Sequence, residues 1–310
     1  MKPARIFFAL GLIGLSAVAL NYGERALPTV PLARASHTLI PEAPPQSPLQ
    51  ASRETYETAA SKHGSAKDDE AVQNTPPVAN ADPRKIGGEK PKEQLEIEAG
   101  MKKIAAAKSN MIGYWVGAFG KNKINIALAE VSGTKANGHS VCAGNFRAIS
   151  GTVKDAGNGR YAFVLNEPGT DKYDGKFEFT IDTNQDELTG KWTPYKQSGT
   201  SAKTYTLKRR TFEYRPSLGD HIKASTGELT EDDVSNLDKE ALRLMRNAIY
   251  ARHGYSFKKM ETRRYFDDKD WYIPMGIDIR DQLTDIEVKN IMLLRRYEKY
   301  AENYYDGYGR

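Results

Sequence analysis

The sequence predicts an α+β multidomain protein in which a small antiparallel β-barrel-like domain precedes a small helical domain. Three observations lead to this class. Residues 23–91 are rich in Pro, Ala, Ser, Gln and Thr and nearly lack large aromatic side chains. Apolar and polar residues then alternate with a period of two over residues 111–214, which is typical of antiparallel strands. From residue 221 to residue 303 the apolar residues recur at helical spacing, which predicts packed helices.

The N-terminus has the features of an export signal. Lys2 and Arg5 precede an apolar run over residues 6–20, shorter than the roughly 20 apolar residues of a typical spanning helix. Ala17-Val18-Ala19 offers a cleavage site inside that run. We therefore predict that residues 1–22 are a signal peptide or, if uncleaved, an inner-membrane anchor. The expected location is periplasmic or extracellular, with membrane contact only through this segment.

The segment between the signal and the first folded domain divides into two parts. Residues 23–91 cannot bury enough apolar surface to offset the entropy of ordering, so they are predicted to be a disordered linker. Residues 92–110 lack proline and contain Lys, Glu, Ala and Leu, which predicts a helix leading into the barrel-like domain. Gly100 is an unfavourable residue inside that helix.

Residues 111–214 are predicted to form an antiparallel meander that closes as a small barrel or sandwich. About seven or eight candidate strands are expected from the alternation. The turn dipeptides between them are Asn137-Gly138, Asn158-Gly159 and Asp174-Gly175. Gly113-Tyr114-Trp115 near the start, with Arg209 and Arg210 near the end, resembles the lipocalin-like barrels, in which a Gly-x-Trp packs against a late arginine. The resemblance implies architecture only.

The interior of this barrel has two interpretations. Small barrels are commonly filled by their own side chains, and somewhat larger ones enclose a ligand. The aromatic residues expected to fill it are Tyr114, Trp115, Phe119, Phe146, Tyr161, Phe163, Phe177, Phe179 and Trp192. This supply favours a packed core, and the alternative is a pocket that carries a small apolar ligand.

Two acidic turns, at residues 171–175 and 182–186, resemble the start of calcium-binding loops. In the second, Glu187 stands where an EF-hand loop needs glycine, and Thr193 stands where it needs glutamate. Both are therefore predicted to be hairpin turns, and we expect neither a metal nor a cofactor.

Motifs of known catalytic chemistry are absent from the sequence. It contains no His-Glu-x-x-His, no Gly-x-Ser-x-Gly and no phosphate-binding glycine loop. The single cysteine, Cys142, excludes an internal disulfide. A net charge of +5 over 310 residues, with both signs interspersed, lacks the concentrated positive surface of nucleic-acid binding. We therefore expect a protein that is not an enzyme and binds no nucleic acid.

The most specific stretch ends a helix predicted over residues 238–253. Asp238 is a favourable N-cap, Gly254 suits the left-handed residue after a helix, and Tyr255 is expected to close onto Tyr250 in a Schellman turn. The pentapeptide at residues 250–254, Tyr-Ala-Arg-His-Gly, resembles the signature of the YARHG domain.

The resemblance extends over residues 221–300. It includes Leu242-x-x-Met245-Arg246-Asn247 before the pentapeptide, and Asp270-Trp271-Tyr272 after it. It implies a small helical domain that occurs mostly in exported bacterial proteins, often near the C-terminus, and that has no established catalytic activity.

The charged residues of the signature helix have a structural interpretation. Arg252 projects onto the apolar stripe of the helix, and Arg246 and His253 lie at its edge. Buried charges are normally paired internally. We therefore expect both arginines to pair with Asp267, Asp268 or Asp270, and His253 to bond a backbone carbonyl. Inside the bundle we expect Asn247 to pair with Asn290.

The alternative interpretation is a binding site for an anionic ligand, such as a carboxylate of a cell-wall glycan or peptide. Its candidate residues are Arg246, Tyr250, Arg252, His253, Asp270, Trp271 and Tyr272. Another alternative is a cell-wall-directed hydrolase that uses Asp267, Asp268, Asp270 and Glu261 with His253. The sequence favours a non-catalytic binding or interaction module whose partner is an envelope protein or a cell-wall glycan.

Overall fold

The computed structural model describes residues 81–196 and 199–304. All of them belong to one structural unit, Ser65–Arg310. The predicted signal peptide or anchor and most of the predicted linker lie outside the described residues. The last part of the linker is described, and there the 3-10 turn η1 (Pro83–Lys85) forms where disorder was predicted. Within the described ranges, no helix is long and apolar enough to cross a membrane.

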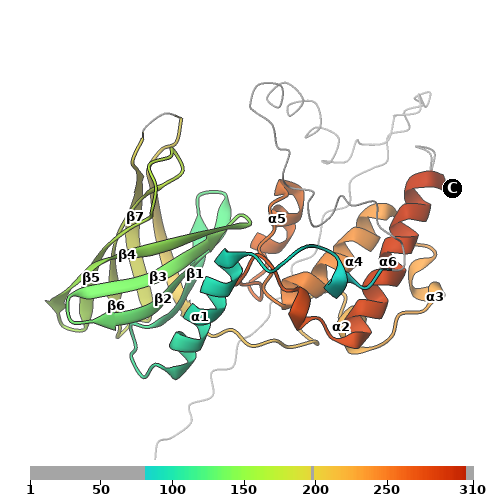
Figure 1. The fold of residues 1–310 in the computed structure, drawn as a ribbon, viewed down its shortest axis with the longest axis horizontal. Coiled ribbons are helices and arrows are strands. Elements are labelled where there is room, and N and C mark those ends of the chain that lie inside the picture. Colours follow the sequence, from blue (N-terminus) through green and yellow to red (C-terminus); the bar gives the residue numbers. More distant parts are fainter. Residues whose placement is uncertain (1–80, 197–198, 305–310) are drawn as a thin grey trace, which may run out of the picture. The chain divides into compact units, whose positions relative to one another are not determined.

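In the described residues, eight antiparallel strands form a closed barrel in chain order (Figure 1). The strands are β1 (Gly113–Phe119), β2 (Asn122–Ser132), β3 (Lys135–Cys142), β4 (Asn145–Gly157), β5 (Arg160–Asn166), β6 (Gly175–Asp182), β7 (Glu187–Pro194) and β8 (Lys203–Arg210). Each strand pairs with the next, and β1 pairs with β8 to close the sheet. The predicted antiparallel meander is confirmed, and it closes as a barrel.

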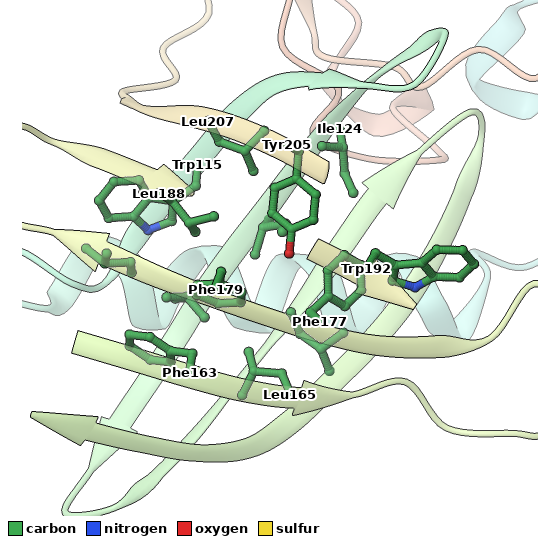
Figure 2. Packing of buried hydrophobic residues seen from close by; sticks show 14 of the residues in the cluster. Trp115, Ile124, Phe163, Leu165, Phe177, Phe179, Leu188, Trp192, Tyr205 and Leu207 are labelled. Carbon is green, nitrogen blue, oxygen red and sulfur yellow. The ribbon is translucent and has the colours of Figure 1, made fainter. Parts of the chain in front are cut away.

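The barrel interior is filled by side chains from alternate positions of the strands (Figure 2). Trp115 is fully buried, and its indole donates a 3.2 Å hydrogen bond to the carbonyl of Met111. Arg209 lies opposite Trp115 and donates to the carbonyls of Ser109 and Ile112. The Gly-x-Trp of the first strand and a late arginine therefore meet where the barrel closes.

Two of the aromatic residues expected inside the barrel face outward instead. Tyr114 packs with Val116 against Ile273 and Met275 of the helical domain. The Phe146 ring lies beside His139 on the outer face. The reason is the period of two: Tyr114 and Phe146 each sit one position away from an inward-facing residue.

The hydroxyl of Tyr205 is buried in the barrel core without a hydrogen-bond partner among the described residues. Only 5% of this residue is exposed, and its ring packs against Phe119 and Phe177. Burial raises the pKa of the phenol, so it stays protonated. Figure 2 shows the hydroxyl directed into the apolar interior.

Replacing Tyr205 with phenylalanine is expected to raise the free energy of unfolding by about 1 kcal/mol, because a buried unsatisfied hydroxyl carries a desolvation penalty of that order. Urea denaturation of the two proteins measures the difference. Tyr195→Phe is a matched control, because the Tyr195 hydroxyl bonds the Glu167 carbonyl at the surface. A loss of stability in Tyr205→Phe would show that the hydroxyl is satisfied in solution.

The helix α1 (Lys92–Ala106) packs on the outer face of β2 and β3. It is shorter than predicted, because Ala107 already has an extended backbone. Gly100, unfavourable in a helix, faces the ring of His139, and a Cβ at this position would lie 3.0 Å from the ring. The glycine therefore makes room for the imidazole. His139 is 3% exposed, and burial lowers its pKa to about 4.

The C-terminal domain consists of short helices around α4 and α6. The helices are α2 (Lys223–Thr226), α3 (Glu231–Val234), α4 (Lys239–Arg252), α5 (Met260–Asp267) and α6 (Asp285–Tyr304), with a 3-10 turn η2 (Arg280–Gln282) before α6. Leu242 and Ile249 of α4 pack against Ile291 and Leu294 of α6 in its main core.

The two ends of α4 form as predicted. The Asp238 carboxylate accepts a 2.7 Å hydrogen bond from the amide of Ala241. At the other end, the Tyr255 amide donates to the Tyr250 carbonyl and the Gly254 amide donates to the Ala251 carbonyl. These are the two bonds of a Schellman turn. Gly254 has a φ of +75°, a conformation that glycine adopts at no steric cost.

The chain after α5 joins the helical domain to the barrel. The Asp267 carboxylate accepts a 2.9 Å hydrogen bond from the amide of Lys123 on β2. The Lys123 ammonium donates to the carbonyls of Lys269 and Tyr272. The side-chain amide of Asn125, also on β2, donates to the carbonyl of Pro274. The acidic and aromatic stretch that follows α5 is thus an interface between the domains.

Candidate functional site

A buried polar cluster surrounds Glu287 on the first turn of α6. Glu287 is 0% exposed. One carboxylate oxygen lies 2.7 Å from Nε2 of His253. The other accepts hydrogen bonds from the Ser225 hydroxyl at 2.7 Å and from the Tyr214 hydroxyl at 3.1 Å. Thr284 completes a capping box with Glu287. We call Tyr214, Ser225, Arg252, His253 and Glu287 the signature cluster.

The electrostatics of the signature cluster favour an ionised carboxylate. Burial raises the pKa of Glu287, and the hydrogen bonds from His253, Thr284 and Ser225 lower it. The lowering is the larger effect, so the pKa of Glu287 lies below its ordinary value. Burial and the neighbouring carboxylate raise the pKa of the Tyr214 phenol, which therefore remains a donor. The Tyr214 ring stacks on the imidazole at 4.2 Å between centroids and covers it.

Arg252 belongs to the same cluster and is 2% exposed. Its guanidinium donates to the carbonyl of Leu218 at 2.8 Å, to the carbonyl of Asp220, and to the Ser225 hydroxyl at 3.1 Å. The expectation that it pairs with carboxylates of residues 267–270 was wrong, because Asp267 is bound to β2 and the chain before α2 covers the guanidinium.

Three further pairings differ from the expectation. Among the described residues His253 bonds the Glu287 carboxylate in place of a backbone carbonyl, because α6 places that carboxylate at the end of α4. Arg246 pairs with Glu298 of α6 at 2.6 and 3.1 Å, because one face of α4 lies along α6. Asn290 makes hydrogen bonds to the backbone around residues 224–229, which leaves none for Asn247.

The last three candidate residues lie in the stretch after α5, where Asp270 and Tyr272 contact the barrel. The Asp270 side chain is exposed, while its carbonyl accepts a 2.7 Å hydrogen bond from Arg210. Trp271 is partly buried against Gly219. Tyr272 is 1% exposed, and its hydroxyl donates to the carbonyl of Tyr255. The structure therefore does not bring these three residues together with Arg252 and His253 in one site.

Tyr250, the first residue of the signature, lines a surface groove. Its ring lies 6.1 Å from that of Tyr255, and Ile279, Leu283 and Arg295 are among the other lining residues. We call this set of five residues the tyrosine groove. Pro83 and Ile86 also line it, and its free volume is about 40 Å³.

Other hollows in the described part of the chain include the following two. One, of about 410 Å³, lies between α3 and α6 and includes Arg296, Tyr297 and Tyr300. The other is a shallow, open hollow of about 1010 Å³ on the sheet of β5 to β8. Among residues 81–196 and 199–304, no group of three or more His, Cys, Asp or Glu side chains could hold a metal ion.

Comparison with known proteins identifies the C-terminal domain. Residues 220–299 match the family model of the YARHG domain, which confirms the resemblance carried by the pentapeptide and its flanking residues. No curated protein and no solved structure matches the chain.

Sequence reasoning missed several members of the signature cluster. The burial of Glu287 and its bond to His253 were not predicted. Ser225 and Tyr214 were not predicted at all. Tyr214 lies outside the matched segment, and no local pattern marks a tyrosine in a connecting segment as a partner of a distant histidine.

Proposed function

We propose that the protein is a non-catalytic binding module of the bacterial cell envelope, in which the barrel is the support and the YARHG domain presents the binding surface. YARHG domains are typical of extracellular or periplasmic proteins, and this supports an exported location. The proposed partner is an envelope protein or a cell-wall glycan.

The observation that carries the proposal is the closure of the signature cluster. A general acid or base must reach the atom to which it transfers a proton. His253 is 3% exposed and Glu287 is 0% exposed, and the Tyr214 ring stacks on the imidazole. These groups bond one another, and this arrangement favours a structural role for the most specific residues of the domain.

The acids proposed for a hydrolase have other partners. Asp267 accepts the Lys123 amide in the interface with the barrel. Glu261 lies on the surface within 3.4 Å of Arg243. His253, the base in that alternative, bonds Glu287 from a different helix. The arrangement therefore supports binding better than hydrolysis.

The packed interior of the barrel favours a barrel that supports the helical domain over a barrel that carries a small apolar ligand. The side chains that fill its interior include Trp115, Phe163, Phe177 and Phe179, each at most 4% exposed. A carrier of a small apolar ligand needs an enclosed volume of several hundred Å³. The core fills the space that such a ligand would take.

The test is incubation of the mature protein with insoluble cell wall and, separately, with solubilised envelope. We expect saturable retention on one of the two, with no release of soluble glycan or peptide fragments. Asp267→Asn and His253→Gln variants serve as controls for a hydrolase. Fragment release that either substitution abolishes would overturn the proposal, and so would the absence of retention on both materials.

A further inference from the structure

Resting on the proposed binding function, we infer that the tyrosine groove is a peptide-binding site that the chain fills with its own residues 82–90. We call these residues the strap. The ligand that the groove fits is an extended, proline-containing, cationic peptide. The same site would take such a segment from a partner once the strap is displaced.

The floor of the groove has the chemistry of a proline-binding surface. Tyr250 and Tyr255 lie side by side with their rings inclined at 55°. Pro83 is buried against this lining and Ile86 is half-buried. Aromatic-lined grooves bind extended proline-containing segments because the segment is already ordered and loses little entropy on binding.

The groove also contacts the backbone of its occupant. The Arg280 guanidinium donates to the carbonyl of Ile86 at 2.6 Å and to the carbonyl of Gly88 at 3.3 Å. Asp278 holds the guanidinium in place through contacts of 3.0 and 2.6 Å. Backbone contacts do not depend on the side chains of the occupant, so another segment can make them.

One position of the occupant is restricted. Gly87 has a φ of +107°, and a Cβ there would lie 2.2 Å from Nη1 of Arg280. A side chain at this position would therefore displace the guanidinium from the backbone that it contacts. The occupant is expected to carry proline, then basic residues, then an apolar residue followed by glycine, as at residues 83–87.

Two aspartates at the rim of the groove face the positive charges of the strap. Arg84 pairs with Asp285 at 2.8 Å and Lys90 pairs with Asp281 at 2.7 Å. The two aspartate side chains are 86% and 66% exposed. Ion pairs as exposed as these contribute little and weaken with salt, so the strap is held mainly by Pro83, Ile86 and the bonds from Arg280.

Few side chains hold the strap, and its exchange is therefore feasible. A tethered segment competes at an effective concentration on the order of millimolar, so a free copy of the same segment cannot displace it at micromolar concentration. A partner segment must either bind more tightly or meet a chain whose strap is weakened.

The experiment uses the full chain and a labelled peptide of residues 81–90, followed by fluorescence anisotropy. The strap is weakened in a Pro83→Gly/Ile86→Ser double variant. We expect saturable binding to this variant and at least tenfold weaker binding to the unaltered chain. A peptide with alanine at the position of Gly87, and a triple variant that adds Arg280→Ala, should each reduce binding at least tenfold.

Hydrogen exchange of the unaltered chain makes the test independent of the folding of the variants. The amides of Arg84 and Lys85, which bond Asp82, should lose protection when the peptide is added at millimolar concentration or above, while the amides of α4 should not. Failure of a folded variant to bind the peptide, or strap amides that exchange only on global unfolding, would overturn the inference. In that case the protein should still be retained on cell wall or envelope. The two experiments therefore distinguish a wrong assignment of the groove from a wrong proposed function.

Discussion

Replacing Glu287 with alanine is expected to lower the free energy of unfolding by about 3–5 kcal/mol, because each buried donor left without an acceptor costs about 1–3 kcal/mol. The substitution removes the acceptor shared by His253, Ser225 and Tyr214 and leaves those donors buried. It also removes the capping box at the start of α6. Urea denaturation followed by far-ultraviolet circular dichroism measures the change.

The matched control lies on the same helix. Glu302 is exposed, and its side chain pairs only at the surface, with Lys239, so Glu302→Ala should change stability by about 0.5 kcal/mol or less. Glu287→Gln should fall between the two, because the amide keeps one acceptor oxygen but carries no charge. A Glu287→Ala protein within about 1 kcal/mol of the unaltered chain would show that the cluster is not a structural centre.

A double-mutant cycle connects this result to Arg252. The two side chains share Ser225 as a partner, so the costs of Glu287→Ala and Arg252→Ala should not add. Each of the two substitutions should lower the free energy of unfolding. Loss of partner binding in Arg252→Ala with unchanged stability would instead favour a ligand site at the end of α4.

Features that depend on neighbours in the chain were predicted well from the sequence. The Schellman turn after α4 needs only residues 250–255, and the N-cap needs only Asp238 and the amides that follow it. The period of two over residues 111–214 likewise reports an alternation within each strand. Local steric and hydrogen-bond rules determine these features, so the sequence carries them directly.

The partners of buried charges were predicted poorly because they are distant in the sequence. The expectation assigned the nearest acids, at residues 267–270, to Arg246 and Arg252. The structure instead pairs Arg246 with Glu298 of α6, 52 residues further on, and Arg252 with backbone carbonyls before α2. His253 bonds Glu287 of α6, 34 residues further on. Several acids were available at similar helical positions, and only the packing of α6 against α4 decides which of them is near.

The strap shows a different limit of sequence reasoning. By composition, residues 82–90 resemble the rest of the predicted linker, and nothing in their pattern predicts burial of Pro83. Their contacts come from Arg280 and Asp285, about 200 residues further along the chain. A short segment held by a preformed surface needs no hydrophobic periodicity of its own.

Lowering the pH from 6.5 to 5 is expected to reduce the free energy of unfolding by about 2 kcal/mol through His139 alone. Burial lowers the pKa of this imidazole from 6.5 to about 4. The unfolded chain therefore binds a proton near pH 6.5 that the folded chain does not accept until about pH 4. Stability is complete above pH 6.5 and falls across that interval, by about 3 kcal/mol in total. Urea denaturation at half-unit steps of pH measures the slope.

Above pH 5, the loss of stability caused by His139 is separate from the loss caused by protonation of carboxylates. The pKa of Glu287 lies below its ordinary value of 4.5, so its contribution is lost only at lower pH. His221 acts in the same direction as His139, because burial lowers its pKa as well. His139→Leu should therefore flatten most of the decline between pH 6.5 and 5. His221→Asn, which tolerates the positive φ of +53° at that position, should leave most of it in place. An equally steep decline in His139→Leu would mean that the imidazole against Gly100 is protonated in the folded chain, and that the packing of α1 on the barrel is open to water.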